Sequence, residues 1–162
     1  MNRNYNALIL KSVKITAGAI LAILFASCLN LKYSATAGII TILSIQNTKK
    51  ETIQTALARG EAFCCALLVS FLCYNFFGYT TAAFGIYLLI FTTLCLIMKW
   101  SSAIAMDSVL ITHFLAEKTM NIPMIANEIS LFLIGAGIGV LLNLSLRPKE
   151  NAWKDKMAEA DE

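Results

Sequence analysis

KYSATAGIITILS at residues 32–44 and KWSSAIAMDSVLI at residues 99–111 begin with the same short pattern, 67 positions apart. Three further pairs match at this offset without a gap: Gly18 with Gly85, Leu43 with Leu110, and Glu61 with Glu128. Each copy of the pattern opens the second of three apolar segments. The chain therefore reads as a three-segment unit written twice.

The composition is that of a membrane protein. Hydrophobic residues make up 58% of the 162 residues and charged residues only 14%, and the mean hydropathy is +0.70. A soluble domain of this length could not cover so much apolar surface. We therefore predict an all-α integral membrane protein whose main partner is the lipid bilayer.

Six apolar runs are present, and a membrane-spanning helix needs about 17–25 residues. The runs are Val13–Leu31, Tyr33–Asn47, Glu61–Phe77, Thr80–Met98, Ser101–Ala116 and Glu128–Leu146. An odd number of crossings per unit turns the second copy upside down. The sequence thus predicts six transmembrane helices arranged as two inverted three-helix repeats, a plan known from transporters.

Positive charges set the expected orientation. If both termini are cytoplasmic, 11 of the 13 Lys and Arg residues lie inside, and Lys32 and Lys118 lie outside. This asymmetry follows the positive-inside rule and predicts a multi-pass protein of the bacterial plasma membrane with cytoplasmic N- and C-termini. The first run could also be read as a signal peptide. Against that, it continues past Cys28 and its repeat partner is internal.

We divide the chain into a six-span domain, residues 1–146, and a polar cytoplasmic tail, residues 147–162. Within the six-span domain, Thr48 and Glu51 form a capping-box pattern, and the apolar residues that follow fall on one helical face. We expect a short interfacial helix at about 48–60, ended by Gly60. The alternative is a charged linker.

The chemistry of an enzyme is not visible. All five cysteines lie in apolar runs, where they behave as small buried hydrophobes, so neither a disulfide framework nor a metal site is expected. No nucleophile–base constellation or phosphate loop is present in the sequence. We predict a non-enzyme without a cofactor and without a nucleic-acid partner.

YSATAGIITILSIQNTKK, residues 33–50, resembles the second-span signature of the bacterial aromatic acid exporter family. VLITH at 109–113 and NEISLFLIGAG at 127–137 resemble its fifth and sixth spans, and the likeness covers about residues 9–148. The family is grouped with fusaric acid resistance proteins, and its wider relatives include plant malate-conducting channels that are six-span homodimers. Most members continue into a cytoplasmic helical domain.

The resemblance implies export of small organic anions, above all aromatic carboxylates, by a homodimer. Two other classes stay open: a passive anion channel and a non-transporting oligomeric membrane scaffold. Because the sequence has no ATP-binding motif, energy coupling would use the proton gradient.

The second and fifth runs are short and rich in hydroxyl groups, and they are equivalent in the two copies. Short helices at matching positions are a sequence pointer to a transport site. We expect a polar cavity near the midplane, with a substrate pathway formed by Thr41, Ser44, Gln46, Arg59, Ser101, Asp107, Ser108 and His113. The alternative is that small residues merely let these helices pack closely.

Three ionisable residues of this pathway have specific expected roles. Asp107 should face a cavity, find a partner or be protonated, because an unpaired carboxylate in a bilayer is costly. His113 could relay protons or form an ordinary hydrogen bond at the membrane interface. Arg59 could receive a substrate carboxylate in bidentate fashion, although the positive-inside rule alone explains a cation there.

Glu61 and Glu128 begin the third and sixth runs and form an equivalent pair. They could act as inner and outer gate residues, or only favour a helix N-terminus through the macrodipole. Gly135 and Gly139 form a GxxxG pattern, for which close helix packing is favoured over a nucleotide loop.

Overall fold

The computed structural model describes residues 2–45 and 49–145. It contains α1 (Asn2–Cys28), α2 (Ala35–Leu43), α3 (Lys49–Phe77), α4 (Thr81–Ile97), α5 (Ile104–Glu117) and α6 (Ile122–Ser145). The predicted all-α fold is therefore confirmed for this part of the chain. The expected tail at 147–162 lies outside the described residues.

Short polar caps separate the later helices. The Thr80 hydroxyl accepts a hydrogen bond from the Ala83 amide at 3.1 Å and starts α4. Lys118 takes a left-handed conformation, with φ 50°, and ends α5. Asn121 then accepts from the Met124 amide at 3.0 Å, and Pro123 fits the first turn of α6.

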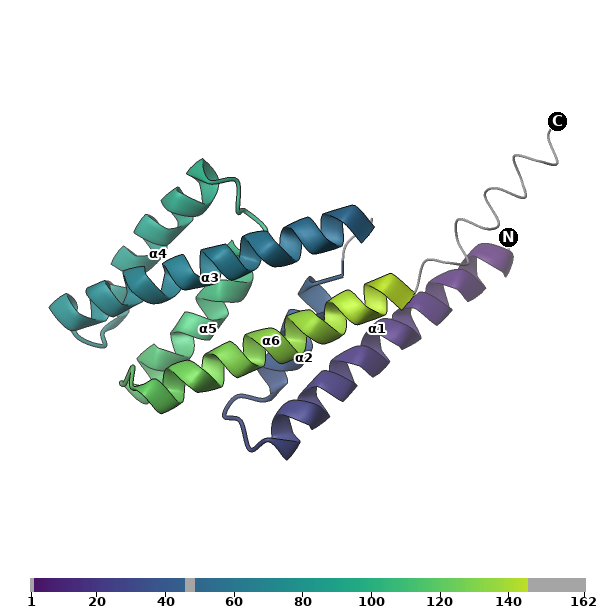
Figure 1. Cartoon of the computed structure of the whole chain (residues 1–162), viewed down its shortest axis with the longest axis horizontal. Coiled ribbons are helices and arrows are strands. Elements are labelled where there is room, and N and C mark those ends of the chain that lie inside the picture. The colour runs from purple at the N-terminus through teal and green to yellow at the C-terminus, as the bar shows by residue number, and fades with distance from the viewer. Residues whose placement is uncertain (1, 46–48, 146–162) are drawn as a thin grey trace.

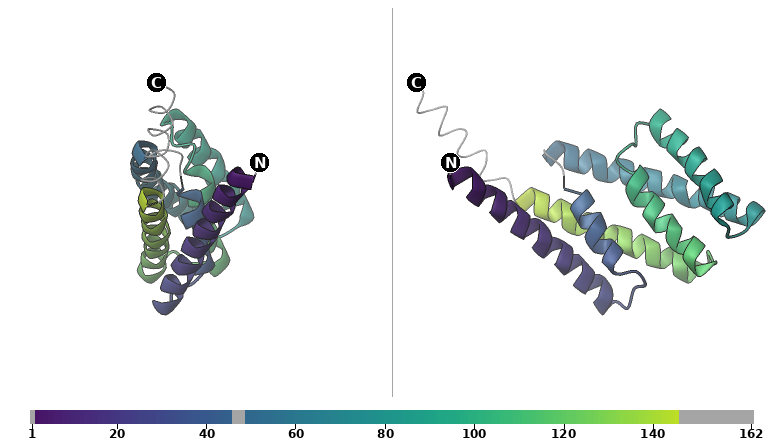
Figure 2. Two further views of the ribbon diagram at one scale, coloured as in Figure 1. Left: turned by 90° about the vertical axis from the view of Figure 1, so that its right-hand side faces the viewer. Right: turned by 180° about the vertical axis from the view of Figure 1, so that it is seen from behind.

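The helices form two groups of three. Helices α1, α2 and α6 pack against one another, and α3, α4 and α5 do the same. Contacts of α3 with α6 and of α2 with α5 join the groups. Figure 1 shows the long helices α3 and α6 in the middle, with α1 and α4 on opposite flanks, and Figure 2 gives the same arrangement from two other sides.

The buried apolar side chains form two cores. In the α3–α4–α5 group, Tyr87, Phe91 and Phe114 are completely buried, and the rings of Tyr87 and Phe91 stack at 5.4 Å between centroids. The second core contains Ile40 and Leu131 of the α1–α2–α6 group together with Leu110 of α5, and it joins the two groups. The outward faces carry large exposed apolar side chains, as a lipid-facing surface requires.

Three helices are long and apolar enough to cross a membrane: Lys11–Cys28, Ile53–Phe77 and Ile122–Leu144. Helix α4 is also apolar but, with 17 residues, is shorter than these three. Helices α2 and α5, with 9 and 14 residues, are about 14 and 21 Å long, against a hydrocarbon core of about 30 Å. The structure thus places two short helices between long ones, at the matching positions where the sequence has its shortest apolar runs.

Three predicted boundaries were wrong. Helix α3 runs through Gly60 without a break, so residues 49–60 are its first turns rather than a separate helix. Helix α6 begins at Ile122 instead of Glu128, because Asn121 caps it earlier. Helix α5 begins at Ile104 instead of Ser101, and Asp107 therefore lies in its first turn.

The GxxxG pattern of α6 serves close packing against α2. A Cβ atom at Gly135 would lie 2.6 Å from the carbonyl oxygen of Ala37, and one at Gly139 would lie 2.9 Å from that of Thr41. Gly137, between them, faces open space. The packing interpretation of Gly135 and Gly139 is therefore confirmed.

We predict that Gly135→Ala and Gly139→Ala each lower the apparent thermal stability of the detergent-solubilised protein. The added methyl group meets backbone of α2, and overpacking of this kind costs about 1–3 kcal/mol. Gly137→Ala is the matched control and should be neutral or stabilising by up to about 1 kcal/mol. Equal destabilisation by all three substitutions would contradict the close α2–α6 contact.

Candidate functional site

The short helices α2 and α5 lie antiparallel beside each other. Thr36, near the start of α2, contacts His113 in the second half of α5. Ser44, at the end of α2, receives a hydrogen bond from Arg59, which also reaches the turn before α5. Both helices therefore carry polar groups toward both ends of their shared contact.

Arg59 is the centre of the polar cluster at one end. Its side chain is only 4% exposed. The Nε atom donates to the carbonyl oxygen of Ser102 at 3.2 Å, and an Nη atom donates to Ser44 Oγ at 3.4 Å. Ser44 Oγ donates onward to the carbonyl oxygen of Ile40 at 2.7 Å. Among the described residues, the hydrogen-bond acceptors of this guanidinium are thus neutral oxygens.

Asp107 lies close to this guanidinium without touching it. The carboxyl is completely buried, and neither oxygen has a hydrogen-bond partner among the described residues. Arg59 and Asp107 act on each other electrostatically, although they do not form an ion pair. The position of Asp107 in the first turn of α5 favours a negative charge through the helix dipole.

Two hydroxyl groups beside Asp107 are also buried and unpaired. They are Tyr87 Oη from α4 and Ser108 Oγ from α5. The two are close enough to influence each other, but their geometry falls short of a hydrogen bond. We call Ser44, Arg59, Tyr87, Asp107 and Ser108 the inner polar cluster. Its unsatisfied atoms are unusual, because buried polar groups normally find partners.

A second cluster occupies the opposite end of α2 and α5. His113 Nδ1 and Glu128 Oε2 are 2.7 Å apart, and Glu128 is completely buried. The side-chain amide of Asn127 donates to Glu128 Oε1 at 3.0 Å. The same amide pairs with the backbone N–H and carbonyl of Lys32, at 2.8 and 3.1 Å. Asn127 thereby ties the α1–α2 loop to α6.

The α1–α2 loop adds further contacts to this cluster. The ring of Tyr33 stacks on the ring of His113, with centroids 4.0 Å apart. Tyr33 Oη donates to Glu117 Oε1 at 3.1 Å, and Lys32 Nζ donates to Glu117 Oε2 at 2.8 Å. This hydrogen bond raises the pKa of the Lys32 ammonium above its usual value. We call the set Lys32, Tyr33, Thr36, His113, Glu117, Asn127 and Glu128 the outer polar cluster.

Apolar side chains separate the two clusters. Ile40 lies one helical turn from both Thr36 and Ser44 along α2, and Leu110 lies midway between Asp107 and His113 on α5. Leu131 of α6 completes the layer, and all three are 1% exposed or less. A buried apolar layer of this kind is unfavourable for an ion that would pass directly between the clusters.

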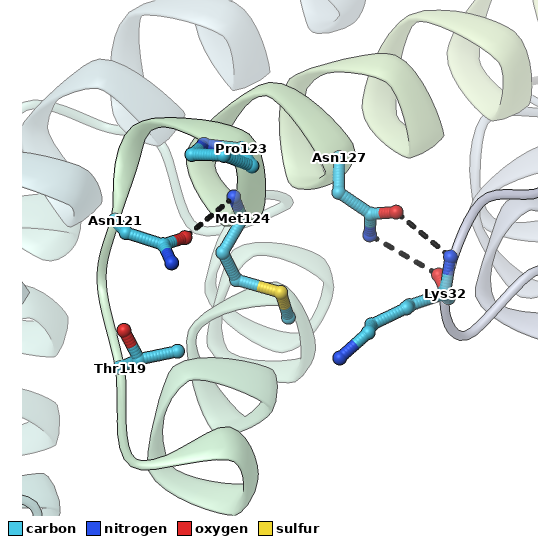
Figure 3. Close-up of a pocket in the computed structure, with 6 residues that line it drawn as sticks. All are labelled: Lys32, Thr119, Asn121, Pro123, Met124 and Asn127. Carbon is cyan, nitrogen blue, oxygen red and sulfur yellow. Dashed lines mark hydrogen bonds between the residues drawn. The ribbon is translucent and has the colours of Figure 1, made fainter.

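A small pocket of about 240 Å³ opens beside the outer cluster (Figure 3). Lys32 and Asn127 line one side of it, and residues of the α5–α6 turn and the first turn of α6 line the other: Thr119, Asn121, Pro123 and Met124. It is therefore not the midplane cavity that the sequence suggested. In the described part of the chain, no three His, Cys, Asp or Glu side chains gather closely enough to hold a metal ion.

The structure brings together four of the predicted pathway residues, Ser44, Arg59, Asp107 and Ser108. Thr41 is buried elsewhere, because its hydroxyl donates to the carbonyl oxygens of Ala37 and Gly135.

The remaining predicted pathway residues lie apart from this group. Ser101 is exposed in the turn before α5, and His113 belongs to the outer cluster. Gln46 lies outside the described residues.

The equivalent pair Glu61 and Glu128 has unlike surroundings. Glu61 is exposed, whereas Glu128 is completely buried against His113. Neither begins a helix, since α3 starts at Lys49 and α6 at Ile122. The macrodipole explanation of both residues is therefore wrong, and their role as gates stays a prediction.

Sequence reasoning missed several members of the clusters. Tyr87 resembled any aromatic residue of an apolar run, and nothing around it signalled a buried hydroxyl. Asn127 gave a usable signal, because an amide next to Glu128 is a costly pair in an apolar segment. Tyr33 and Glu117 lie 84 positions apart, and only the fold unites them.

We predict that Asn127→Ala speeds amide hydrogen exchange across residues 29–34, measured by mass spectrometry. The substitution removes both hydrogen bonds that hold the Lys32 backbone, at a cost on the order of 2 kcal/mol. Ser130→Ala is the control, because its hydroxyl bonds only within α6, to the carbonyl oxygen of Ala126. Unchanged amide hydrogen exchange in Asn127→Ala would show that the hydrogen bonds from Asn127 to the Lys32 backbone do not hold the α1–α2 loop.

Comparison with known proteins agrees with the helical membrane fold and the apolar sequence. The model of "Aromatic acid exporter family member 1" matches residues 7–146. "Uncharacterized protein YqjA" of Bacillus subtilis (strain 168) is 36% identical over 152 residues, which cover 92% of this chain and 47% of that protein. The chain thus spans about half the length of this relative. No solved structure matches this chain. The chain belongs to the aromatic acid exporter family.

Proposed function

We propose that the chain forms the membrane part of an exporter of small organic anions, and that the anion binds at the inner polar cluster. The observation that carries this proposal is the burial of Arg59. A guanidinium in an apolar interior is costly unless a negative charge compensates it. Here its described hydrogen-bond acceptors are the neutral oxygens of Ser44 and Ser102.

A carboxylate suits this position in charge and in geometry. The planar guanidinium presents paired N–H groups that match the two oxygens of a carboxylate. Exchanging neutral acceptors for a carboxylate would replace weak hydrogen bonds with charge-assisted ones. The substrate anion would thus bind more strongly than the groups it displaces.

Aromatic rings near Arg59 favour aromatic acids within this class. Phe63 lies one helical turn from Arg59 on α3, is 4% exposed, and stacks on Phe132 of α6 at 5.1 Å. An aromatic acid with its carboxylate at Arg59 could place its ring against this pair. The family membership points to the same class of substrate.

We also propose six crossings, with α2 and α5 completing them, and an inverted repeat. Exchanging α1 with α4, α2 with α5 and α3 with α6 leaves the set of contacting helix pairs unchanged. The turn hydrogen bonds from Thr36 N to Tyr33 O and from Ala103 N to Trp100 O are equivalent at the 67-residue offset, and both measure 2.8 Å. The antiparallel contact of α2 and α5 also supports an inverted second copy.

The remaining expectations complete the proposal. The protein would lie in the bacterial plasma membrane with both termini cytoplasmic and would act as a homodimer. Two alternatives to an exporter are a passive anion channel, which would give unitary currents, and a scaffold, which would carry no anion at all. The buried guanidinium argues against the scaffold, because a purely structural membrane core would gain stability from an apolar residue at position 59.

We predict that Arg59→Gln lowers the uptake of radiolabelled benzoate into proteoliposomes at least tenfold. Removal of one partner of a desolvated charge pair costs about 2–5 kcal/mol, and 1.4 kcal/mol already corresponds to a factor of ten. Arg59→Lys keeps the charge but loses the paired N–H donors, so its uptake rate should lie between those of the wild type and Arg59→Gln. Lys99→Gln removes an exposed cation and should transport normally. Wild-type rates in Arg59→Gln would refute the proposed site.

A separate prediction concerns topology. On a cysteine-free background, a cysteine at position 118 should react with an impermeant maleimide added to intact cells, because the charge pattern places Lys118 outside. A cysteine at position 50 should react only after the cells are opened. The reverse pattern would contradict cytoplasmic termini.

A further inference from the structure

The inner polar cluster contains a carboxyl that anion binding alone does not explain. Asp107 is completely buried, and both of its oxygens lack partners among the described residues. An organic anion at Arg59 would have no use for a second negative charge nearby. A site built only for anions would place a hydroxyl or an amide at this position.

Among the described helices that pack against α5, one positive charge, that of Arg59, acts on the Asp107 carboxyl. Helix α5 packs against α2, α3 and α4. Arg59 of α3 acts on the carboxyl electrostatically, and Tyr87 and Cys95 are the titratable groups of α4 that feel it. Helix α2 has no titratable side chain. The local balance is therefore one guanidinium against one carboxyl.

This balance changes when a substrate carboxylate binds. In the empty site, the charged form of Asp107 would offset the charge of Arg59 electrostatically, without a hydrogen bond to it. With a substrate carboxylate on Arg59, two carboxylates would share one cation in a water-poor interior. Two like charges held this close cannot both stay ionised, and one of them takes up a proton. The substrate, hydrogen-bonded to the guanidinium, keeps its charge, whereas Asp107 has no such bond.

We infer that Asp107 is a proton-binding site linked to the anion site, so that one proton binds to Asp107 for each organic anion that binds to Arg59. The inference rests on the proposed function. The proton comes from bulk water and forms an O–H bond on the Asp107 carboxyl. The substrate arrives as a carboxylate and leaves as one, and no other bond changes. The loaded site then carries the same net charge as the empty one.

The two unpaired hydroxyl groups fit both states of Asp107. Tyr87 Oη and Ser108 Oγ are buried beside it without partners. A hydroxyl group can donate to a carboxylate or accept from a carboxylic acid by rotating its O–H bond. Neither hydroxyl forms a hydrogen bond with Asp107 among the described residues, so a side-chain movement would have to bring one of them into reach before it could serve either form.

The direction of the linkage has a consequence for transport. Anion and proton would bind together and cross as an electrically neutral unit, which the gradient of the substrate, and not the inward proton gradient, would drive outward. An exchanger that returns protons against the anion would show the opposite linkage, with a proton released when the anion binds. The sign of the proton change on binding therefore separates the two mechanisms.

The test measures proton uptake by the purified full chain in weakly buffered detergent solution during benzoate titration, with a pH-indicating dye. At a pH where Asp107 is charged in the empty site, the wild-type protein should take up about one proton per bound benzoate. Asp107→Asn, which keeps the shape of the side chain, should bind benzoate with no proton uptake. Glu117→Gln changes a carboxylate at the other end of the same helix and should behave as wild type.

A measurement on the wild type alone guards against an Asp107 variant that misfolds. If one proton binds with each anion, benzoate affinity should fall about tenfold for each unit of rising pH, once Asp107 is charged in the empty site. A pH-independent affinity, proton release on binding, or full proton uptake by a folded Asp107→Asn variant would each overturn the inference. Failure of the wild type to bind benzoate at all would instead refute the anion site itself.

Discussion

The constraint on which the structure depends is that α2 and α5 are too short to cross a bilayer as helices. Irregular backbone at their ends has to be covered by protein, because lipid offers no hydrogen bonds. The backbone of α2 is covered by α6, and this close approach depends on Gly135 and Gly139. The shortness of α2 and α5 also explains the polar groups at their ends. Short helices leave room there for polar side chains that a continuous span would exclude.

The two polar clusters differ in how many of their buried polar atoms have hydrogen-bond partners, and this difference indicates different roles. The outer cluster is connected throughout, from the backbone of Lys32 through Asn127 and Glu128 to His113. A fully satisfied network of this kind rigidifies what it joins. The inner cluster keeps unpaired oxygens at Asp107 beside a buried guanidinium, which is costly in the absence of a ligand. The connected cluster therefore suits a structural role, and the unsatisfied cluster is where the proposed anion site lies.

The sequence was sufficient for the all-helical fold and for the short second and fifth helices, and it assigned Arg59 and Asp107 to one predicted pathway without predicting that they lie close together. It was insufficient where tertiary contacts decide. Thr41 looked like a pathway residue, but its hydroxyl is used by the carbonyl oxygens of Ala37 and Gly135, a contact that depends on how closely α6 approaches. The helix start at Ile122 was missed because a single Asn cap outweighed the charge pattern around Glu128.

The proposed internal repeat would preserve the framework but not the chemistry of the two halves. At the 67-residue offset Arg59 corresponds to Ala126, and Asp107 corresponds to Ile40. The inner cluster therefore takes one charged residue from each copy, and neither has a charged equivalent. Two identical copies would offer the same chemistry to both sides of the membrane. Replacing single positions on the proposed duplicated framework would give the two ends of the proposed anion path different charges.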